Sequence, residues 1–153
     1  MTPRERELVR WFPGLRFPPA SILAGPDGNY NCIGWAAGHT VNWWEPSGDH
    51  RNYWPPDCRE GFTVEFYIEA FATQGYAVCD DGELQSGVEK VAIMATDGVV
   101  LHMMKQDGIG VWSSKLGRFE RISHGLHDLV GDAYGRIHTF LSRPRQPPIS
   151  VSE

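Results

Sequence analysis

The spacing of apolar positions predicts two helices in the first half of the chain. Near the start, the sequence TPRE has the form of a capping box with proline in the first turn, and apolar residues follow at helical spacing until Pro13. A second helix is predicted from Thr63 to Gln74, because apolar residues recur there at i, i+3, i+4 and i+7. Gly75 is typical of its C-terminal end.

Over residues 89–117 the period changes to two, which predicts an antiparallel meander. The strands read EKVAIM, VVLHMMKQ and VWSSKLG, with turns at Asp97-Gly98 and around Asp107-Gly108. After them, Ser123 suits the start of a short helix, and RIHTFLSR suits a closing strand. Helices first and a contiguous antiparallel sheet later predict an α+β fold, with N-terminal helices packed on the sheet.

Length and composition narrow the class of protein. The 153 residues are enough for one core, so we expect a single α+β domain over residues 1–145 and a flexible C-terminal tail over residues 146–153. Apolar residues make up 41% and charged residues 22%, which argues against disorder, and no apolar run approaches the ~18 residues of a membrane span. The first twenty residues carry charges where a secretion signal needs an apolar stretch. We therefore expect a cytoplasmic protein with no membrane partner.

Charge and cysteine spacing exclude two further kinds of partner. The net charge of −5 argues against binding to a nucleic acid backbone. The three cysteines, Cys32, Cys58 and Cys79, have no C-x-x-C spacing. His124, His127 and Asp128 are close enough in sequence to share a metal, but a solvated helical face explains them more simply. We expect no metal and no cofactor.

The segment GPDGNYNCIGWAAGHT is the most informative in the chain. A loop leads directly into a run with helical potential, which puts Cys32 in the first turn of a helix. Backbone N–H groups and the helix dipole favour a thiolate there, so Cys32 is a candidate nucleophile, and a small packing residue is the alternative. Asn31 and Asn29 are candidates to bind an oxyanion or to cap the helix, and capping is the simpler role.

A nucleophilic cysteine needs a base, and His102 is the best-placed histidine. It is the one polar residue in VVLHMM, in the middle of a predicted inner strand. The alternative is a core histidine whose hydrogen bonds are satisfied. Two residues are candidates to orient its ring: Ser114, about opposite on the next strand, and Glu89, which a regular hairpin puts on the same face as His102.

The loop VNWWEPSGDHRNYWPPDC concentrates aromatic residues among prolines and polar residues. Its tryptophans, Trp43, Trp44 and Trp54, are candidates for a recognition wall over a groove, because flat side chains give large contact area at a small entropic cost. The alternative is a small core that pins a long irregular loop to the domain.

The chain resembles an uncharacterised, mainly bacterial family of small domain proteins. The family pattern is close to N-C-I-A-W-A, Y-W-P-P, G-Y-x-x-C, E-K-V-A-I, H-A-A-R-Q, W-T-S-K-L-G and Y-G-x-V-x-x-F. Here the motifs read NCIGWA, YWPP, GYAVC, EKVAI, HMMKQ, WSSKLG and YGRIHTF, over roughly residues 11–145. HMMKQ departs from the pattern after the histidine.

More distantly, a cysteine at a helix start followed by two strands that end in V-L-H is similar to the NlpC-type and CHAP-type cysteine peptidases and amidases. That resemblance implies a papain-like fold with Cys32 as nucleophile. In NlpC-type members the base leads the first of those strands, where this chain has Glu89 and Lys90, so His102 matches the third catalytic position.

Two functions follow from these patterns. The first is a papain-like cysteine hydrolase or acyl transferase that acts on an amide in a peptide, a glutamine side chain or a cell-wall crosslink. Cys32 then attacks, His102 transfers the proton, and Ser114 or Glu89 orients the ring. The second is a non-catalytic binding or immunity-type protein whose tryptophan-rich loop is the contact surface. The expected partner is a peptide or protein substrate.

Overall fold

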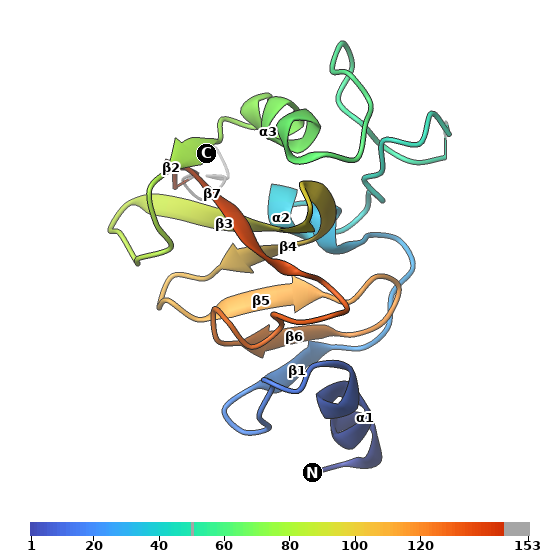
Figure 1. The fold of residues 1–153 in the computed structure, drawn as a ribbon, viewed down its shortest axis with the longest axis vertical. Helices are drawn as coiled ribbons and strands as arrows, with labels where there is room; N and C mark the ends of the chain where they lie inside the picture. The colour runs from blue at the N-terminus through green and yellow to red at the C-terminus, as the bar shows by residue number, and fades with distance from the viewer. Residues whose placement is uncertain (50, 146–153) are drawn as a thin grey trace, which may run out of the picture.

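The fold is an open, seven-stranded antiparallel sheet with three short helices. A computed structural model describes residues 1–49 and 51–145, and all seven strands of this part belong to one sheet (Figure 1). The elements, in chain order, are α1 (Pro3–Trp11), β1 (Ser21–Ala24), α2 (Cys32–Ala37), α3 (Val64–Ala72), β2 (Ala77–Cys79), β3 (Val88–Thr96), β4 (Val99–Gln106), β5 (Trp112–Lys115), β6 (Arg121–His124) and β7 (Arg136–Pro144). The strand order is β1-β6-β5-β4-β3-β7-β2. The α+β class is therefore confirmed.

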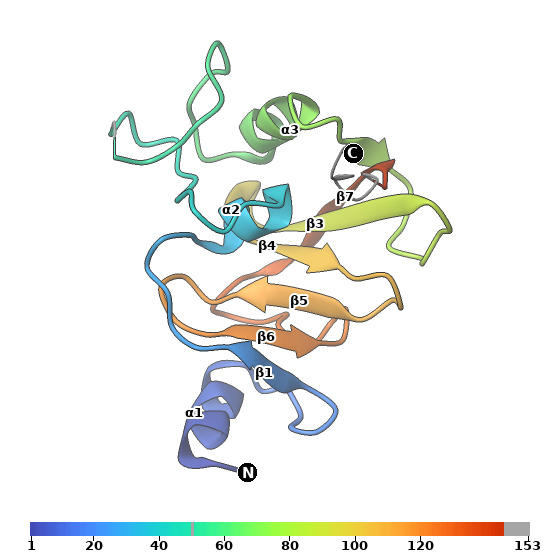
Figure 2. The same ribbon diagram turned by 180° about the vertical axis from the view of Figure 1, so that it is seen from behind.

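The two faces of the sheet carry separate apolar cores. On one face, α2 and α3 pack over β3 and β4; the core residues there include Ala36, Tyr67, Phe71, Ile93 and Met103, and Figure 2 shows α2 in front of β4. On the other face, α1 and the turns around residues 126–134 cover a second core; its members include Leu8, Phe12, Met94, Met104 and Ile122. Because strand side chains alternate between faces, neighbours such as Met103 and Met104 belong to different cores.

The predicted helices and the meander are confirmed. Thr2 and Glu5 form the capping box at the start of α1, with both reciprocal bonds present. The second predicted helix is α3, and Thr63 is its N-cap residue. The turn between β3 and β4 uses two left-handed residues, Asp97 with φ of 50° and Gly98 with φ of 78°, as a tight hairpin requires.

One predicted element is wrong, and three strands, β1, β2 and β6, were not predicted. Ser123 does not begin a helix. It lies inside β6, where its hydroxyl meets that of Ser21 on β1 at 2.9 Å, and turns follow. β1 and β2 are only four and three residues long, too short to show a period of two. Long-range pairing decides the structure of such short segments, and local pattern does not.

A bulge in β4 changes the face on which its central residues lie. Ala95 pairs with Val100, but Met94 pairs with His102, so Leu101 is one residue too many in the ladder. An uninterrupted hairpin gives His102 the partner Ile93, whose side chain belongs to the core under α2. The bulge therefore moves the His102 side chain to the opposite face of the sheet.

The predicted flexible tail, residues 146–153, falls outside the described residues. Within the part of the chain that the structure describes, no helix is long and apolar enough to cross a membrane.

Candidate functional site

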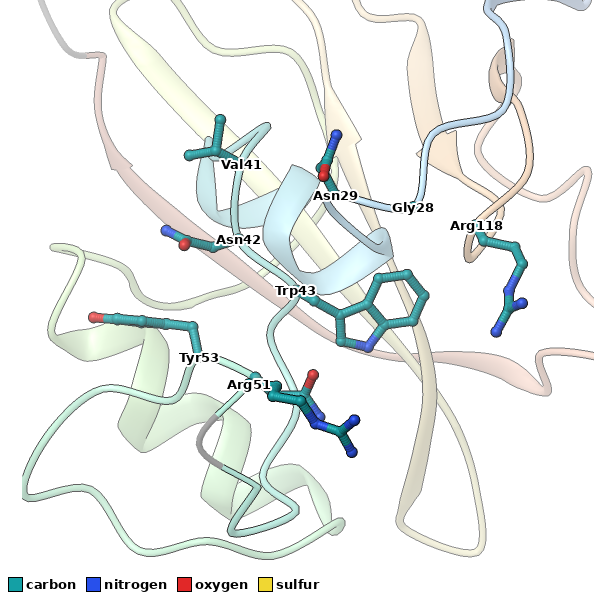
Figure 3. Close-up of a pocket in the computed structure, with 9 residues that line it drawn as sticks. Gly28, Asn29, Val41, Asn42, Trp43, Arg51, Tyr53 and Arg118 are labelled. Atoms are coloured by element: carbon teal, nitrogen blue, oxygen red, sulfur yellow. The ribbon is translucent and has the colours of Figure 1, made fainter.

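A pocket of about 710 Å³ opens beside the N-terminal end of α2. Three loops form it: the turn before α2, the two arms of the tryptophan-rich loop, and the turn between β5 and β6 (Figure 3). The lining residues are Gly28, Asn29, Val41, Asn42, Trp43, Arg51, Asn52, Tyr53 and Arg118. Its walls are thus mostly polar or aromatic, and they come from segments far apart in the sequence.

The two adjacent tryptophans of the tryptophan-rich loop, Trp43 and Trp44, lie in different environments. Trp44 is fully buried, and its ring packs on Phe71 and on Tyr53, with centroids 5.7 Å and 4.7 Å away. Trp43 is half-buried and lines the pocket. Within the described part of the chain its indole makes no ring contact, and its Nε1 makes no hydrogen bond. Trp44 therefore anchors the loop in the core, and Trp43 offers a free aromatic surface.

Backbone bonds hold the two arms of this loop together. The Tyr53 amide donates to the Trp43 carbonyl at 2.7 Å, and the Glu45 amide donates to the Tyr53 carbonyl at 3.0 Å. Asn31, the N-cap residue of α2, accepts from the amides of Gly34 and Trp44 through its Oδ1, both at 3.0 Å. The loop is therefore fixed to α2 by a side chain that also starts the helix.

The buried lysine Lys115 fixes the opposite wall. Its ammonium donates to the carbonyls of Asp27, Tyr30 and Gly117, at 2.5, 3.1 and 2.5 Å. The first two flank the pocket residues Gly28 and Asn29, and the third precedes Arg118. Burial lowers the pKa of Lys115, while the charge of Asp27 acts to raise it. Three carbonyl acceptors match the three donors of an ammonium, so this side chain holds two walls of the pocket in place.

The pocket is positively charged. Arg118 is exposed, and its guanidinium makes no ion pair or hydrogen bond in the described part of the chain. Arg51 is paired with Asp49 through two of its nitrogens, at 2.7 and 3.1 Å. Among the described residues, no aspartate or glutamate lines the pocket. Arg118 is thus a cation free to meet a ligand.

Cys32 is the first residue of α2, as predicted, but its environment does not favour a thiolate. Burial raises the pKa of its thiol to about 11; the backbone N–H groups of Met103 and Ile33, which favour the anion, offset this only in part. Cys32 packs against the core that α2 and α3 cover.

His102 belongs to a buried hydrogen-bonded chain on the other face of the sheet. Its Nε2 lies 2.9 Å from the Ser114 hydroxyl, and that oxygen lies 2.7 Å from Nε2 of His124. His124 Nδ1 lies 2.8 Å from the Gly125 carbonyl, which only accepts, so His124 carries its proton on Nδ1. Ser114 then donates to His124 and accepts from His102 Nε2–H. The prediction that Ser114 faces His102 agrees with this contact.

The structure does not join Cys32 and His102 by a hydrogen bond. His102 Nε2 is bonded to Ser114, and within the described residues its buried Nδ1 has no hydrogen-bond partner. Burial lowers the pKa of His102 well below its ordinary value, and the nearby His124 adds to this shift. The bulge at Leu101 is the physical reason, because it turns His102 away from the face that α2 covers.

Glu89 is not on the face of His102, contrary to the prediction. It lies five residues before Met94, the partner of His102, and an odd separation along β3 puts the two side chains on opposite faces. Its carboxylate accepts from Arg143 Nε at 3.0 Å, and Arg143 also donates to the Gln74 carbonyl at 2.7 Å. Glu89 therefore joins β3 to β7 near α3.

Of the four predicted substrate-binding residues, the pocket includes Trp43. Asn31 and Trp44 are buried structural residues. Trp54 packs edge-on against Tyr67, with centroids 5.1 Å apart, and its Nε1 donates to the Arg59 carbonyl. The loop is therefore partly the small core considered from the sequence and partly a pocket wall.

Sequence reasoning missed most of the pocket, Arg118 above all. Arg118 lies in a short turn of unremarkable sequence, and it is brought to the tryptophan-rich loop only by the pairing of β5 with β6. Asn29 was considered, but as a cap or oxyanion donor. Among the described residues, no three histidine, cysteine, aspartate or glutamate side chains are grouped as metal ligands would be.

Comparison with known proteins identifies a family without assigning an activity. No curated protein and no solved structure matches the chain. One family model matches residues 21–142, which include the whole pocket and every strand except the last two residues of β7. The chain belongs to the family described as a domain of unknown function, DUF7689.

Proposed function

We propose that this protein is a non-catalytic binding domain whose ligand occupies the pocket between the tryptophan-rich loop and the β5–β6 turn. The observation that carries the proposal is the pocket itself, built from three loops around Trp43 and Arg118 (Figure 3). Its volume of about 710 Å³ lies in the range that small-molecule sites occupy, roughly 300–1,000 Å³.

The pocket combines rigid walls with polar groups that the fold does not use. Trp44 and Lys115 hold the walls from inside the protein. Trp43 Nε1, the Arg118 guanidinium and the Asn29 side-chain amide make no hydrogen bonds within the described residues. Such groups are available to a ligand at little cost in reorganisation, which supports a binding role.

Hydrolysis at Cys32 by a papain-like protein stays a prediction from the sequence. Its position at the start of α2, against β4, is in keeping with that analogy. The raised pKa of the thiol and the bonding of His102 to Ser114 give the pair no support, because a nucleophile needs a base within reach. The geometry therefore favours binding.

A fragment screen by nuclear magnetic resonance tests the proposal. Uniformly ¹⁵N-labelled protein is titrated with a library of small anions, cations and neutral polar molecules, and both backbone amides and the indole N–H signals of the six tryptophans are followed. We expect the hits to shift the Trp43 indole and the amides of Asn29 and Arg118. Trp44 Nε1, bonded to His39 at 3.3 Å, serves as an internal control.

Two results would overturn the proposal. One is that no compound in the library shifts these signals. The other is a set of hits confined to a separate, apolar cavity of about 410 Å³, which is lined by α1, Phe119 and Tyr134.

A further inference from the structure

The side chains that line the pocket indicate the chemical class of its ligand. We infer that the ligand is a small organic anion with a flat heteroaromatic ring, the chemistry of a nucleoside monophosphate. The inference rests on the proposed function and goes beyond it, because that function sets no ligand class.

The first step concerns the ring. Trp43 is the pocket tryptophan, and in the described part of the chain no other ring stacks on it. An indole that lines a pocket and lacks a ring partner is a stacking platform for a flat ligand group. Aliphatic ligands use such a surface less well, because they lack the π face.

The second step concerns charge. The chain has a net charge of −5, yet the pocket has two arginines and no carboxylate among its lining residues. Within the described residues Arg118 has no ion pair, and Arg51 keeps one terminal nitrogen, Nη1, out of its bonds with Asp49. A guanidinium binds a phosphate or carboxylate through paired hydrogen bonds. In Figure 3 Arg118 stands to the right of the Trp43 ring and Arg51 below it, and all three line the same pocket, so an anion bound to either guanidinium can carry a ring over the indole.

The third step concerns the edges of the ring. Three asparagines line the pocket: Asn29, Asn42 and Asn52. Asn52 donates its two N–H groups to Glu45 and Ser47, so within the described residues its amide oxygen is left for a ligand. Asn42 Nδ2 meets His39, which leaves the Asn42 amide oxygen and one N–H. The Asn29 amide is free at both ends within the described residues. Donors and acceptors together suit the hydrogen-bonding edge of a nucleobase.

Three probes separate these contributions. Adenosine monophosphate has the ring and the anion, adenosine has the ring alone, and ribose 5-phosphate has the anion alone. We expect calorimetric titration to give adenosine monophosphate an affinity about tenfold or more above that of either partial probe, since stacking and charge both contribute. Adding salt is expected to lower the affinity for adenosine monophosphate and to leave the affinity for adenosine unchanged.

Matched variants locate the binding. Trp43→Leu is expected to reduce the affinity for adenosine monophosphate about tenfold and to leave that for ribose 5-phosphate unchanged. Trp11→Leu, at an exposed tryptophan outside this pocket, is its control. Arg118→Gln is expected to remove the difference between adenosine monophosphate and adenosine. Arg136→Gln removes the same charge at an exposed position that does not line the pocket.

The outcomes distinguish this inference from the function beneath it. If ribose 5-phosphate binds as tightly as adenosine monophosphate, or if Arg136→Gln weakens binding as much as Arg118→Gln, the inference is wrong. If none of the three probes binds while the fragment screen still reports ligands at Trp43, the ligand class is wrong and the binding function stands. If an oligonucleotide binds and the monophosphate does not, a nucleic acid is the partner and the inference again fails.

Discussion

Tyr134 stacks face to face on His102, with ring centroids 3.9 Å apart and ring planes 2° from parallel. The stack covers an imidazole that is fully buried and that bonds Ser114 through Nε2. A buried, stacked position favours the neutral form of the ring. Through these contacts His102 joins β4, β5 and the turn that carries Tyr134. In this position the ring is buried and held by its neighbours.

Stability should fall in mild acid because of this buried pair of histidines. Burial lowers the pKa values of His102 and His124 in the folded state, whereas the unfolded chain has the ordinary value of ~6.5. The unfolded state therefore binds more protons below that pH. The stabilising contribution is complete above about pH 6.5 and is lost as the pH falls towards the folded-state values. We expect the free energy of unfolding in urea to drop by up to about 2.7 kcal/mol per pH unit for the two groups.

Variants test whether His102 and His124 cause this pH dependence of the free energy of unfolding. His102→Gln is expected to reduce it by about half, whereas His127→Gln, at an exposed position, is expected to leave it as in the native protein. His39, whose pKa burial also lowers, is kept in all variants and contributes equally to each. A native slope that is flat between pH 5 and 7 would contradict the prediction.

Ser114→Ala should be strongly destabilising. The substitution leaves a buried donor on His102 and a buried acceptor on His124 without their partner, and each such group costs about 1–3 kcal/mol. We expect a loss of about 2–4 kcal/mol in the free energy of unfolding, measured in urea at pH 7.5. Ser123→Ala, at the β1–β6 edge, is the control and should cost below about 1 kcal/mol. Equal losses for both variants would show that the chain of hydrogen bonds is not the cause.

Local sequence pattern was enough to predict the long helices and strands. A single extra residue in β4 made the predicted arrangement of the site residues wrong. The capping box of α1, the apolar stripe of α3 and the Asp97-Gly98 turn each act over a few residues, so their sequences specify them. The bulge at Leu101 has no such signal: VVLHMM reads as a regular strand. Since strand side chains alternate, that one residue moved His102 to the other face and undid the predicted pairing with Cys32 and Glu89.

The pocket was hidden for a different reason. The turn with Arg118 and the loop with Trp43 meet only after β5 and β6 have paired, and no periodicity links the two segments. The density of aromatic residues did indicate a special loop. It did not say which tryptophan is core and which is wall, because that depends on the contacts of Trp44 with Phe71 across the fold.

The raised pKa of Cys32 leads to a prediction about thiol reactivity. With a pKa of about 11, very little thiolate is present at pH 7.5, so iodoacetamide should modify Cys32 slowly and with an alkaline midpoint. This differs from the thiolate that its place at a helix start suggested from the sequence. Peptide mapping after brief alkylation, from pH 7 to 10.5, measures the rate at each cysteine, and the Cys32 rate should still be rising at the upper limit. We expect Cys79, which is not among the core residues, to label before Cys32, which packs against one core.

The same experiment tests the hydrolase prediction. His102→Ala should leave Cys32 labelling at pH 7.5 unchanged, because the ring is bonded to Ser114. The folded fraction of this variant is measured alongside by circular dichroism, so that exposure of the thiol by unfolding is recognised. Fast labelling of Cys32 near neutral pH, lost in folded His102→Ala, would restore the nucleophile and base pair and count against a purely binding role.

Lys115 should control the shape of the pocket although it does not line it. Its ammonium holds the carbonyls of Asp27, Tyr30 and Gly117, and the Asp27 amide adds a bond to the Arg118 carbonyl at 3.0 Å. Lys115→Met keeps a chain of similar length but removes all three donors, so the loop before α2 and the β5–β6 turn lose their shared anchor. We expect a loss of about 2–4 kcal/mol in the free energy of unfolding, since bonds to a charged donor are worth more than neutral ones. Amide hydrogen exchange at Asn29 and Arg118 should become faster by a larger factor than exchange in β3, which is the sign of local loosening and not of global destabilisation.

Lys105→Met is the matched control. Lys105 is half-buried, with its ammonium 5.1 Å from the centre of the Trp35 ring, and its loss should leave exchange at Asn29 and Arg118 unchanged. If Lys115→Met accelerates exchange equally throughout the sheet and the loops, the lysine supports the fold as a whole and has no special hold on the pocket.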